Sequence, residues 1–165
     1  KKKIKIFNGE WLGEILTEER VNELANVFSN LVVDGVVNAP GVNGAMEFLE
    51  SSEKYKKYII TGTPTTEIKP ILQQRKMNHF FEEAFGSPEK KEFWVKHILE
   101  KENIGAENCV FIGDALADYE AAIDNKITFI LRETKEAMSL FKNYKGYKVK
   151  DMTSLHEVLS DIEKI

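Results

Sequence analysis

Two acidic residues, Asp114 and Asp118, lie four positions apart directly after a short apolar run. The run, Cys109–Ile112, predicts a strand buried on both faces, and Gly113 gives the backbone freedom to turn where the strand ends. The acids then fall on a loop and the first turn of a helix, from where both can point at one place. Two carboxylates at the carboxyl end of a parallel strand are typical of a site for Mg²⁺. The alternative role is capping of the following helix.

Two further polar stretches follow predicted strands elsewhere in the chain. Thr61, Gly62 and Thr63 come directly after the short apolar strand Tyr58–Ile60. Their hydroxyls suit an anion, and the glycine lets backbone N–H groups come close to it. Lys91 lies just past a glycine-proline turn and supplies a compact positive charge for a phosphate or for crowded carboxylates. Taken singly, the threonines are also typical helix caps and the lysine is also typical of a solvated surface.

The elements that must position these residues alternate along the chain. From Val42 onward the apolar periodicity predicts helix, strand, helix, short strand, helix, strand, helix and strand, followed by a helix over Thr134–Lys142, a short edge strand and a last helix. This order is typical of a Rossmann-like α/β fold, a parallel sheet with helices on both faces. Ligands bind such sheets at the carboxyl ends of the strands, where all three polar stretches fall. Local signals also predict that Gly105 ends one helix and that Ser154 and Glu157 form a capping box for another.

The residues before this alternating region are predicted to be helical. Thr17 and the acids after it predict a helix start, and apolar residues then repeat at helical spacing to about Leu31 or Val33. The sequence Asn38-Ala39-Pro40-Gly41 predicts a break. The break separates this helical segment from the alternating region in the sequence.

Composition narrows the class of protein. The chain has 165 residues and a net charge of −4, and its longest basic run, Lys1–Lys3, is too short to indicate a nucleic-acid surface. No apolar run approaches the ~20 residues that a membrane span needs. The single cysteine, Cys109, allows no internal disulfide and is compatible with a reducing cytoplasm. We therefore expect a cytoplasmic protein without nucleic-acid or membrane partners, whose oligomeric state cannot be read from the sequence.

Three of these stretches together resemble motifs of the haloacid dehalogenase (HAD) superfamily of hydrolases. Tyr58–Pro64 (YIITGTP) resembles the second motif of that family, a hydrophobic strand that ends in threonine or serine. Gly86–Lys91 (GSPEKK) resembles its lysine motif, with Lys91 the better match and Lys90 the second choice. Gly113–Ala122 (GDALADYEAA) resembles its acidic motif and is the most specific of the three. Among family members, the chain looks most like those with a helical cap, the phosphoglycolate phosphatases and β-phosphoglucomutases.

The resemblance implies a Mg²⁺-dependent phosphohydrolase that acts on a small phosphorylated metabolite through a phosphoaspartyl intermediate, with a phosphomutase as a close variant. Thr61 would bind the transferring phosphoryl group, Thr63 would contact substrate or phosphate, and Lys91 would balance the charge around them. Asp114 and Asp118 would hold Mg²⁺ directly or through water. The ion would orient the phosphate for attack.

The first motif of the family, a strand followed by Asp-x-Asp-Gly, carries the nucleophile and the general acid or base, and no Asp-x-Asp occurs in this chain. The nearest sequence, Val32-Val33-Asp34-Gly35, has valine where the nucleophile belongs. Asp34 is either a degenerate first motif or a residue of a cap. The second interpretation is favoured: residues 1–37 are then the remnant of a helical cap, and residues 38–165 are a core that lacks its first strand.

On this interpretation the nucleophile lies outside the chain or is absent, so whether the chain alone is an enzyme stays open. A chain that begins without methionine agrees with it. Two other classes of function compete with a phosphohydrolase. One is a non-catalytic relative that binds a phosphorylated ligand or a protein, and the other is a receiver domain of the response-regulator type. The receiver domain is the weaker alternative, because its acidic pair comes early in the chain.

Overall fold

The computed structural model describes residues 6, 9–10, 13 and 15–164, and the chain divides into two units, residues 1–39 and 40–165. In the first unit, helix α2 spans Glu18–Asn38. The hydroxyl oxygen of Thr17 accepts a hydrogen bond from the backbone N–H of Arg20 at 3.2 Å, which confirms the predicted start of this helix. The helix continues beyond the predicted end, and Phe28 and Leu31 of its apolar stripe are exposed. Trp11 and Leu12, which belong to the predicted cap remnant, lie outside the described residues.

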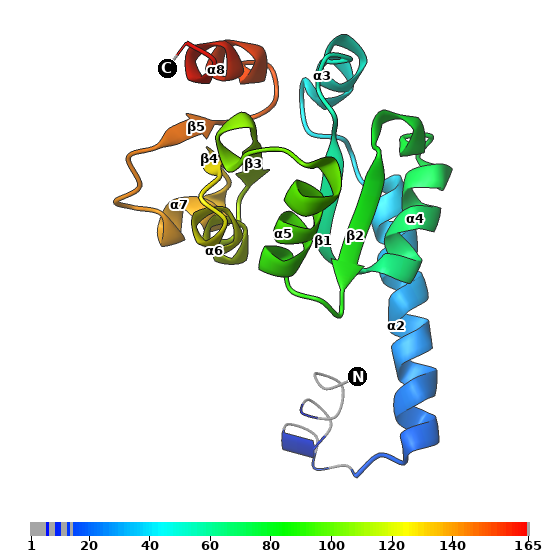
Figure 1. The fold of residues 1–165 in the computed structure, drawn as a ribbon. Coiled ribbons are helices and arrows are strands. Elements are labelled where there is room, and N and C mark those ends of the chain that lie inside the picture. The colour runs from blue at the N-terminus through cyan, green and yellow to red at the C-terminus, as the bar shows by residue number, and fades with distance from the viewer. Residues whose placement is uncertain (1–5, 7–8, 11–12, 14, 165) are drawn as a thin grey trace. The chain divides into compact units, whose positions relative to one another are not determined.

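The second unit alternates helices and strands in the predicted order (Figure 1). The strands are β1 (Tyr58–Pro64), β2 (Glu83–Ser87), β3 (Val110–Gly113), β4 (Thr128–Arg132) and β5 (Tyr147–Val149). The helices are α3 (Ala45–Ser51), α4 (Thr65–Gln74), α5 (Lys91–Glu102), α6 (Leu116–Asp124), α7 (Lys135–Leu140) and α8 (Leu155–Ile162), with short 3-10 turns η2 (Asn78–Phe80) and η3 (Ala106–Asn108). Every strand pair described is parallel, as the alternation predicts.

The strands form two sheets rather than one. In the first, β1 pairs with β2, and in the second, β4 lies between β3 and β5. Within the described residues, β1 and β3 therefore have one partner strand each (Figure 1). The prediction that the strand before Gly113 is buried on both faces is wrong, because no residue of β3 is fully buried and Val110 is 36% exposed. A strand with one free edge keeps part of its surface in contact with solvent.

The central strand β4 is enclosed on both faces. Phe129 and Leu131 point to one face, where they pack against residues of α6 and α7. Ile130, between them, points to the other face and packs against α8. A third cluster, built on Val95 of α5 and Ala121 of α6, contacts Ile60 of β1 as well as Phe111 of β3 and so joins the two sheets.

Two predicted helix caps differ from the structure. The residue that caps the end of α5 is Asn103, which adopts the left-handed conformation with φ 50°, and not Gly105. Asparagine tolerates that conformation better than most residues do. The side chain of Ser154 makes no capping hydrogen bond at the start of α8, so the predicted capping box with Glu157 is wrong. The cap of α7 by Thr134 does form, with the N–H of Ala137 at 3.0 Å.

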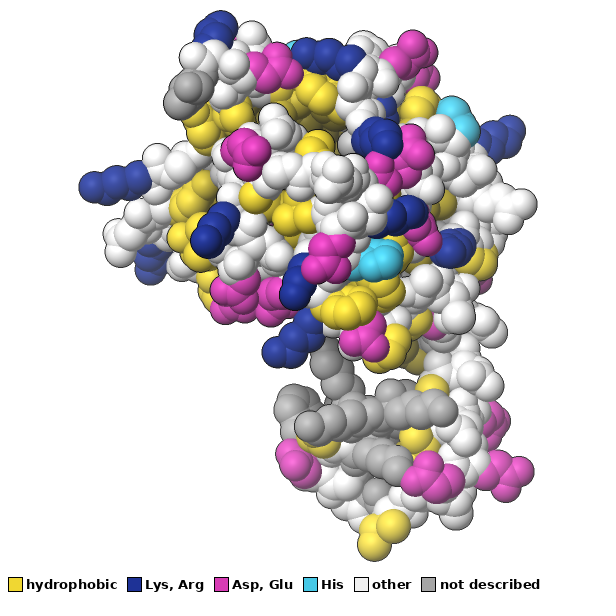
Figure 2. Space-filling model, in the orientation of Figure 1, with side chains coloured by type: hydrophobic (Ala, Val, Ile, Leu, Met, Phe, Trp, Pro, Cys, Tyr) yellow, Lys and Arg dark blue, Asp and Glu magenta, His cyan; other side chains and the backbone are white. Residues whose placement is uncertain are grey.

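The surface carries charges of both signs. On the face that Figure 2 shows, basic and acidic side chains are interspersed with hydrophobic ones, and neither sign forms an extended patch. Among the described helices, none combines the length and apolarity that crossing a bilayer requires.

Candidate functional site

The polar residues of β1 lie at its carboxyl-terminal half. The hydroxyl oxygen of Thr61 accepts the backbone N–H of Thr63 at 3.2 Å, and the two hydroxyl oxygens are 3.4 Å apart. Gly62 between them is exposed, and a Cβ built on it would meet nothing within 4 Å. The backbone at Gly62 is therefore open to approach by a ligand, and both hydroxyls lie beside it.

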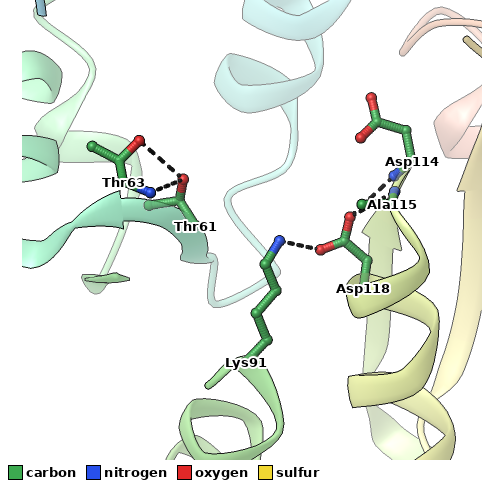
Figure 3. Close-up of polar contacts among 6 residues, drawn as sticks. All are labelled: Thr61, Thr63, Lys91, Asp114, Ala115 and Asp118. Atoms are coloured by element: carbon green, nitrogen blue, oxygen red, sulfur yellow. Dashed lines mark hydrogen bonds and ion pairs between the residues drawn. The ribbon is translucent and has the colours of Figure 1, made fainter. Parts of the chain in front are cut away.

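Lys91 and Asp118 form an ion pair that joins α5 to α6 (Figure 3). The other carboxylate oxygen of Asp118 accepts the backbone N–H groups of Asp114 and Ala115, at 3.2 and 3.0 Å. The side chain of Asp118 is only 7% exposed, and such a buried carboxylate is costly unless cations and N–H groups surround it. Lys91 makes this contact, whereas Lys90 is the exposed residue before the helix.

Gly113 provides the room for this carboxylate. A Cβ at Gly113 would lie 2.5 Å from Cβ, Cγ and Oδ2 of Asp118, which is closer than side-chain atoms pack. The backbone of Gly113 has no positive φ, since only Gly13 and Gly44 among the described glycines do. Gly113 is therefore needed for space and not for the turn that the sequence analysis expected.

Asp114 pairs with a different cation. Its Oδ2 accepts a hydrogen bond from Nη1 of Arg132 at 3.2 Å, and the two side chains are 43% and 30% exposed. Arg132 is the last residue of β4, so it reaches the site from the neighbouring strand. Arg132 was not among the residues predicted for the site, although its place at the carboxyl end of a predicted parallel strand was the available signal.

The close-up shows how the predicted residues lie (Figure 3). The Asp118 carboxylate points toward Lys91, while the Asp114 carboxylate points away from Asp118. Thr61 and Thr63 contact each other on the far side of Lys91. The structure thus places Lys91 between the threonines of β1 and the acidic turn after β3, and it directs the two acids to different cations.

The carboxylate oxygens at this site are ligands of the type that Mg²⁺ prefers, but they are too few to complete its coordination. Mg²⁺ binds one or two carboxylates together with waters and phosphate oxygens. The other carboxylate oxygen of Asp114 has no hydrogen-bond partner among the described residues, and the side chain is partly exposed, so it can offer that oxygen to a cation. Asp118 has its oxygens engaged by Lys91 and two N–H groups. Within the part of the chain that the structure describes, no cluster of three or more acidic, histidine or cysteine side chains could hold a metal.

The alternative first motif does not have the structure that the motif needs. Asp34 lies within α2 and is exposed, and its backbone carbonyl accepts a hydrogen bond from the Asn38 side chain at 2.9 Å. The family motif requires a strand that ends in a loop. The degenerate-motif interpretation of Asp34 is therefore wrong.

Comparison with known proteins is consistent with this arrangement. The chain is 25% identical over 114 residues to a 5'-nucleotidase of Pseudomonas aeruginosa, a match covering 65% of this chain and 48% of the relative. The chain thus spans about half the length of this curated relative. A crystal structure described as a "predicted phosphoglycolate phosphatase" from Haemophilus somnus superimposes with a TM-score of 0.82 and 18% identity, covering 96% of this chain and 75% of that one.

A haloacid dehalogenase-like family protein of Streptococcus pneumoniae also shares the fold, with a TM-score of 0.67 and 21% identity over 88% of this chain and 71% of that one. The family model for haloacid dehalogenase-like hydrolases matches residues 2–125. That range contains β1, β2, β3 and the residues Thr61, Thr63, Lys91, Asp114 and Asp118, whereas Arg132 lies beyond it. The chain therefore belongs to the haloacid dehalogenase-like hydrolases.

Proposed function

We propose that the complete gene product is a Mg²⁺-dependent phosphohydrolase of a small phosphorylated metabolite, for which this chain supplies the phosphate- and metal-binding residues. The observation that carries the proposal is the Lys91–Asp118 ion pair. It holds the ammonium group of Lys91 between the hydroxyls of β1 and the acidic turn after β3, at the ends of parallel strands where ligands bind. Membership of the hydrolase family supports the same conclusion.

Each residue has a task that follows from its chemistry. The Thr61 hydroxyl and the open backbone at Gly62 donate hydrogen bonds to phosphoryl oxygens. Thr63 contacts the phosphate or the rest of the substrate. Lys91, held by Asp118, offsets the negative charge that the phosphoryl group carries during transfer.

Asp114 and Asp118 would hold Mg²⁺, directly or through water. When bound, the ion would neutralise phosphate charge and orient the phosphoryl group for attack. The incomplete donor set agrees with a site that further oxygens from water, from the phosphate or from another carboxylate complete.

The nucleophile is the part that the described residues do not provide. We infer that it is a carboxylate on a further strand, placed between β1 and β3, whose free edges lie over the same packed cluster. The carboxylate oxygen would bond to phosphorus while the bond from phosphorus to the substrate oxygen breaks, and a general acid would protonate the leaving alcohol. Water would then cleave the acyl phosphate, giving inorganic phosphate and the free carboxylate.

The test is hydrolysis of a panel of phosphate esters by the complete gene product, with and without Mg²⁺. The panel includes a nucleoside 5'-monophosphate and phosphoglycolate, because similar proteins carry those names. Asp114→Asn should lower kcat/KM by about a hundredfold or more without unfolding the protein. Asp124→Asn, at the exposed far end of α6, the helix that follows Asp114, is the matched control and should retain activity. Retained activity in Asp114→Asn would refute the role of Asp114.

A non-catalytic phosphate-binding protein is the second candidate, and the absence of any Asp-x-Asp sequence favours it. This alternative predicts that inorganic phosphate binds and that no ester on the panel is hydrolysed. A cytoplasmic location remains a prediction from the sequence.

A further inference from the structure

Arg132 is the cation next to Asp114, and it is incompletely partnered. Its Nη1 donates to Oδ2 of Asp114 at 3.2 Å, while its Nε–H is buried and has no hydrogen-bond partner among the described residues. A buried donor without a partner is uncommon in folded proteins and calls for an explanation. The present arrangement of the guanidinium therefore leaves one of its donors unused.

The second acid near Arg132 already accepts hydrogen bonds from other residues. Asp151 accepts hydrogen bonds from the hydroxyl and N–H of Thr153 and from the side chain of Asn43. These bonds, with a smaller contribution from the charge of Arg132, hold the pKa of Asp151 below its ordinary value. Asp151 therefore does not hold the guanidinium by a hydrogen bond, and Asp114 is the carboxylate that does.

A cation at Asp114 must compete with this guanidinium. A divalent ion bound there would lie within a few ångströms of the positive charge of Arg132, which repels it. The carboxylate must also turn from its present direction, away from Asp118, before both acids can approach one ion (Figure 3). That turn would lengthen or break the bond between Asp114 and Arg132.

We propose that Arg132 is a positioning residue that holds the Asp114 carboxylate in the metal-free protein and competes with the divalent cation for it. This inference rests on the proposed metal site at Asp114 and Asp118. Binding of the cation releases the guanidinium, whose donors then become free to rotate toward other acceptors. The cost of displacing Arg132 weakens cation binding and makes it depend on the charge at position 132.

A purely structural ion pair would behave differently. Both side chains are partly exposed, and exposed pairs of this kind contribute little to stability. A structural role predicts a small change in stability and no change in cation affinity when Arg132 is replaced. Competition predicts that the cation binds more tightly when Arg132 is replaced by an uncharged residue.

The experiment is a calorimetric titration of the full chain with Mg²⁺, and with Mn²⁺ as a second probe. Arg132→Met should tighten binding by about three- to tenfold, because one positive charge near the ion is lost. Arg132→Lys keeps the charge and should bind much as the wild type does. Lys148→Met is the matched control, since Lys148 lies on the adjacent strand β5 and approaches Glu133 instead of Asp114.

A second measurement follows the wild-type chain as Mg²⁺ is added, and uses a variant only to assign the resonance. The Nε–H resonance of Arg132, assigned by its absence from the spectrum of Arg132→Met, should shift on addition of Mg²⁺. Wild-type affinity in Arg132→Met together with an unmoved resonance would overturn the role of Arg132 and leave the metal site standing. An absence of cation binding in both the wild type and Arg132→Met would overturn the metal site and, with it, this inference.

Discussion

The carboxyl group of Asp118 occupies the space that a Cβ of residue 113 would need, so glycine is the residue that fits there without a shift of Asp118. Any side chain there would push Asp118 away from Lys91 and from the N–H groups of Asp114 and Ala115. Because Asp118 is buried, its charge would then lose part of its compensation. The acidic motif therefore needs its glycine for packing.

We predict that Gly113→Ala destabilises the protein by about 1–3 kcal/mol, the usual cost of overpacking a tight site. Chemical denaturation monitored by circular dichroism measures this difference. Gly62→Ala is the matched control: a Cβ there meets nothing within 4 Å, so stability should stay at or slightly above that of the wild type. A Gly113→Ala protein as stable as Gly62→Ala would show that Asp118 can move at no cost.

At the scale of elements, the side chain of Glu102 at the end of α5 contacts the start of β1. Glu102 accepts a hydrogen bond from the hydroxyl of Tyr58 at 2.6 Å and pairs with Lys56. The bond from Lys56, followed by that from Tyr58, lowers the pKa of Glu102 below its ordinary value of about 4.5. Burial and the bond to Glu102 raise the pKa of Tyr58 in turn.

These shifts predict an acid-sensitive contribution to stability. A carboxyl group with a lowered pKa stabilises the fold fully above its ordinary pKa, and it loses this effect as pH falls through the lower pKa of the folded state. The melting temperature of Glu102→Gln should therefore lie below that of the wild type at pH 7, and the gap should close below about pH 4.5. Glu100→Gln, an exposed neighbour paired weakly with Lys96, is the control and should show no comparable gap. A gap that persists unchanged at pH 3 would contradict this assignment.

The elements also show where prediction from sequence succeeds. The helix start at Thr17 and the alternation of helices and strands from Val42 onward follow from local patterns, and both are confirmed. The caps predicted at Gly105 and Ser154 do not form: Asn103 takes the left-handed position after α5, and the Ser154 side chain makes no capping hydrogen bond. In the site, the order of the polar stretches and their places after predicted strands indicated Lys91 and Asp118, whereas Arg132 lies 18 residues from Asp114 in the chain, and the parallel pairing of β3 with β4 brings the two together.

At the scale of the whole second unit, the free edges of β1 and β3 are the main departure from a continuous sheet. Alternate residues of a parallel strand direct their N–H groups to opposite edges. Each of these strands therefore leaves alternate N–H groups without a strand partner in the described residues. The burial of β3 was predicted wrongly for this reason, since burial depends on the neighbouring strand and not on the apolar run itself.

Hydrogen exchange followed by NMR measures how well the backbone amides at these strand edges are protected. In the 165-residue chain, alternate amides of β3 and β1 should exchange at least about tenfold faster than Phe129–Leu131 of β4, which has a partner on each side. If the complete gene product supplies the proposed nucleophile strand between β1 and β3, the same alternate amides should be protected in the complete gene product and not in the 165-residue chain. Uniform protection of β3 in the 165-residue chain would mean that its edge is already covered. A dependence of that protection on protein concentration would then identify a second copy as the cover, and the strand proposed to carry the nucleophile would have no free edge to join.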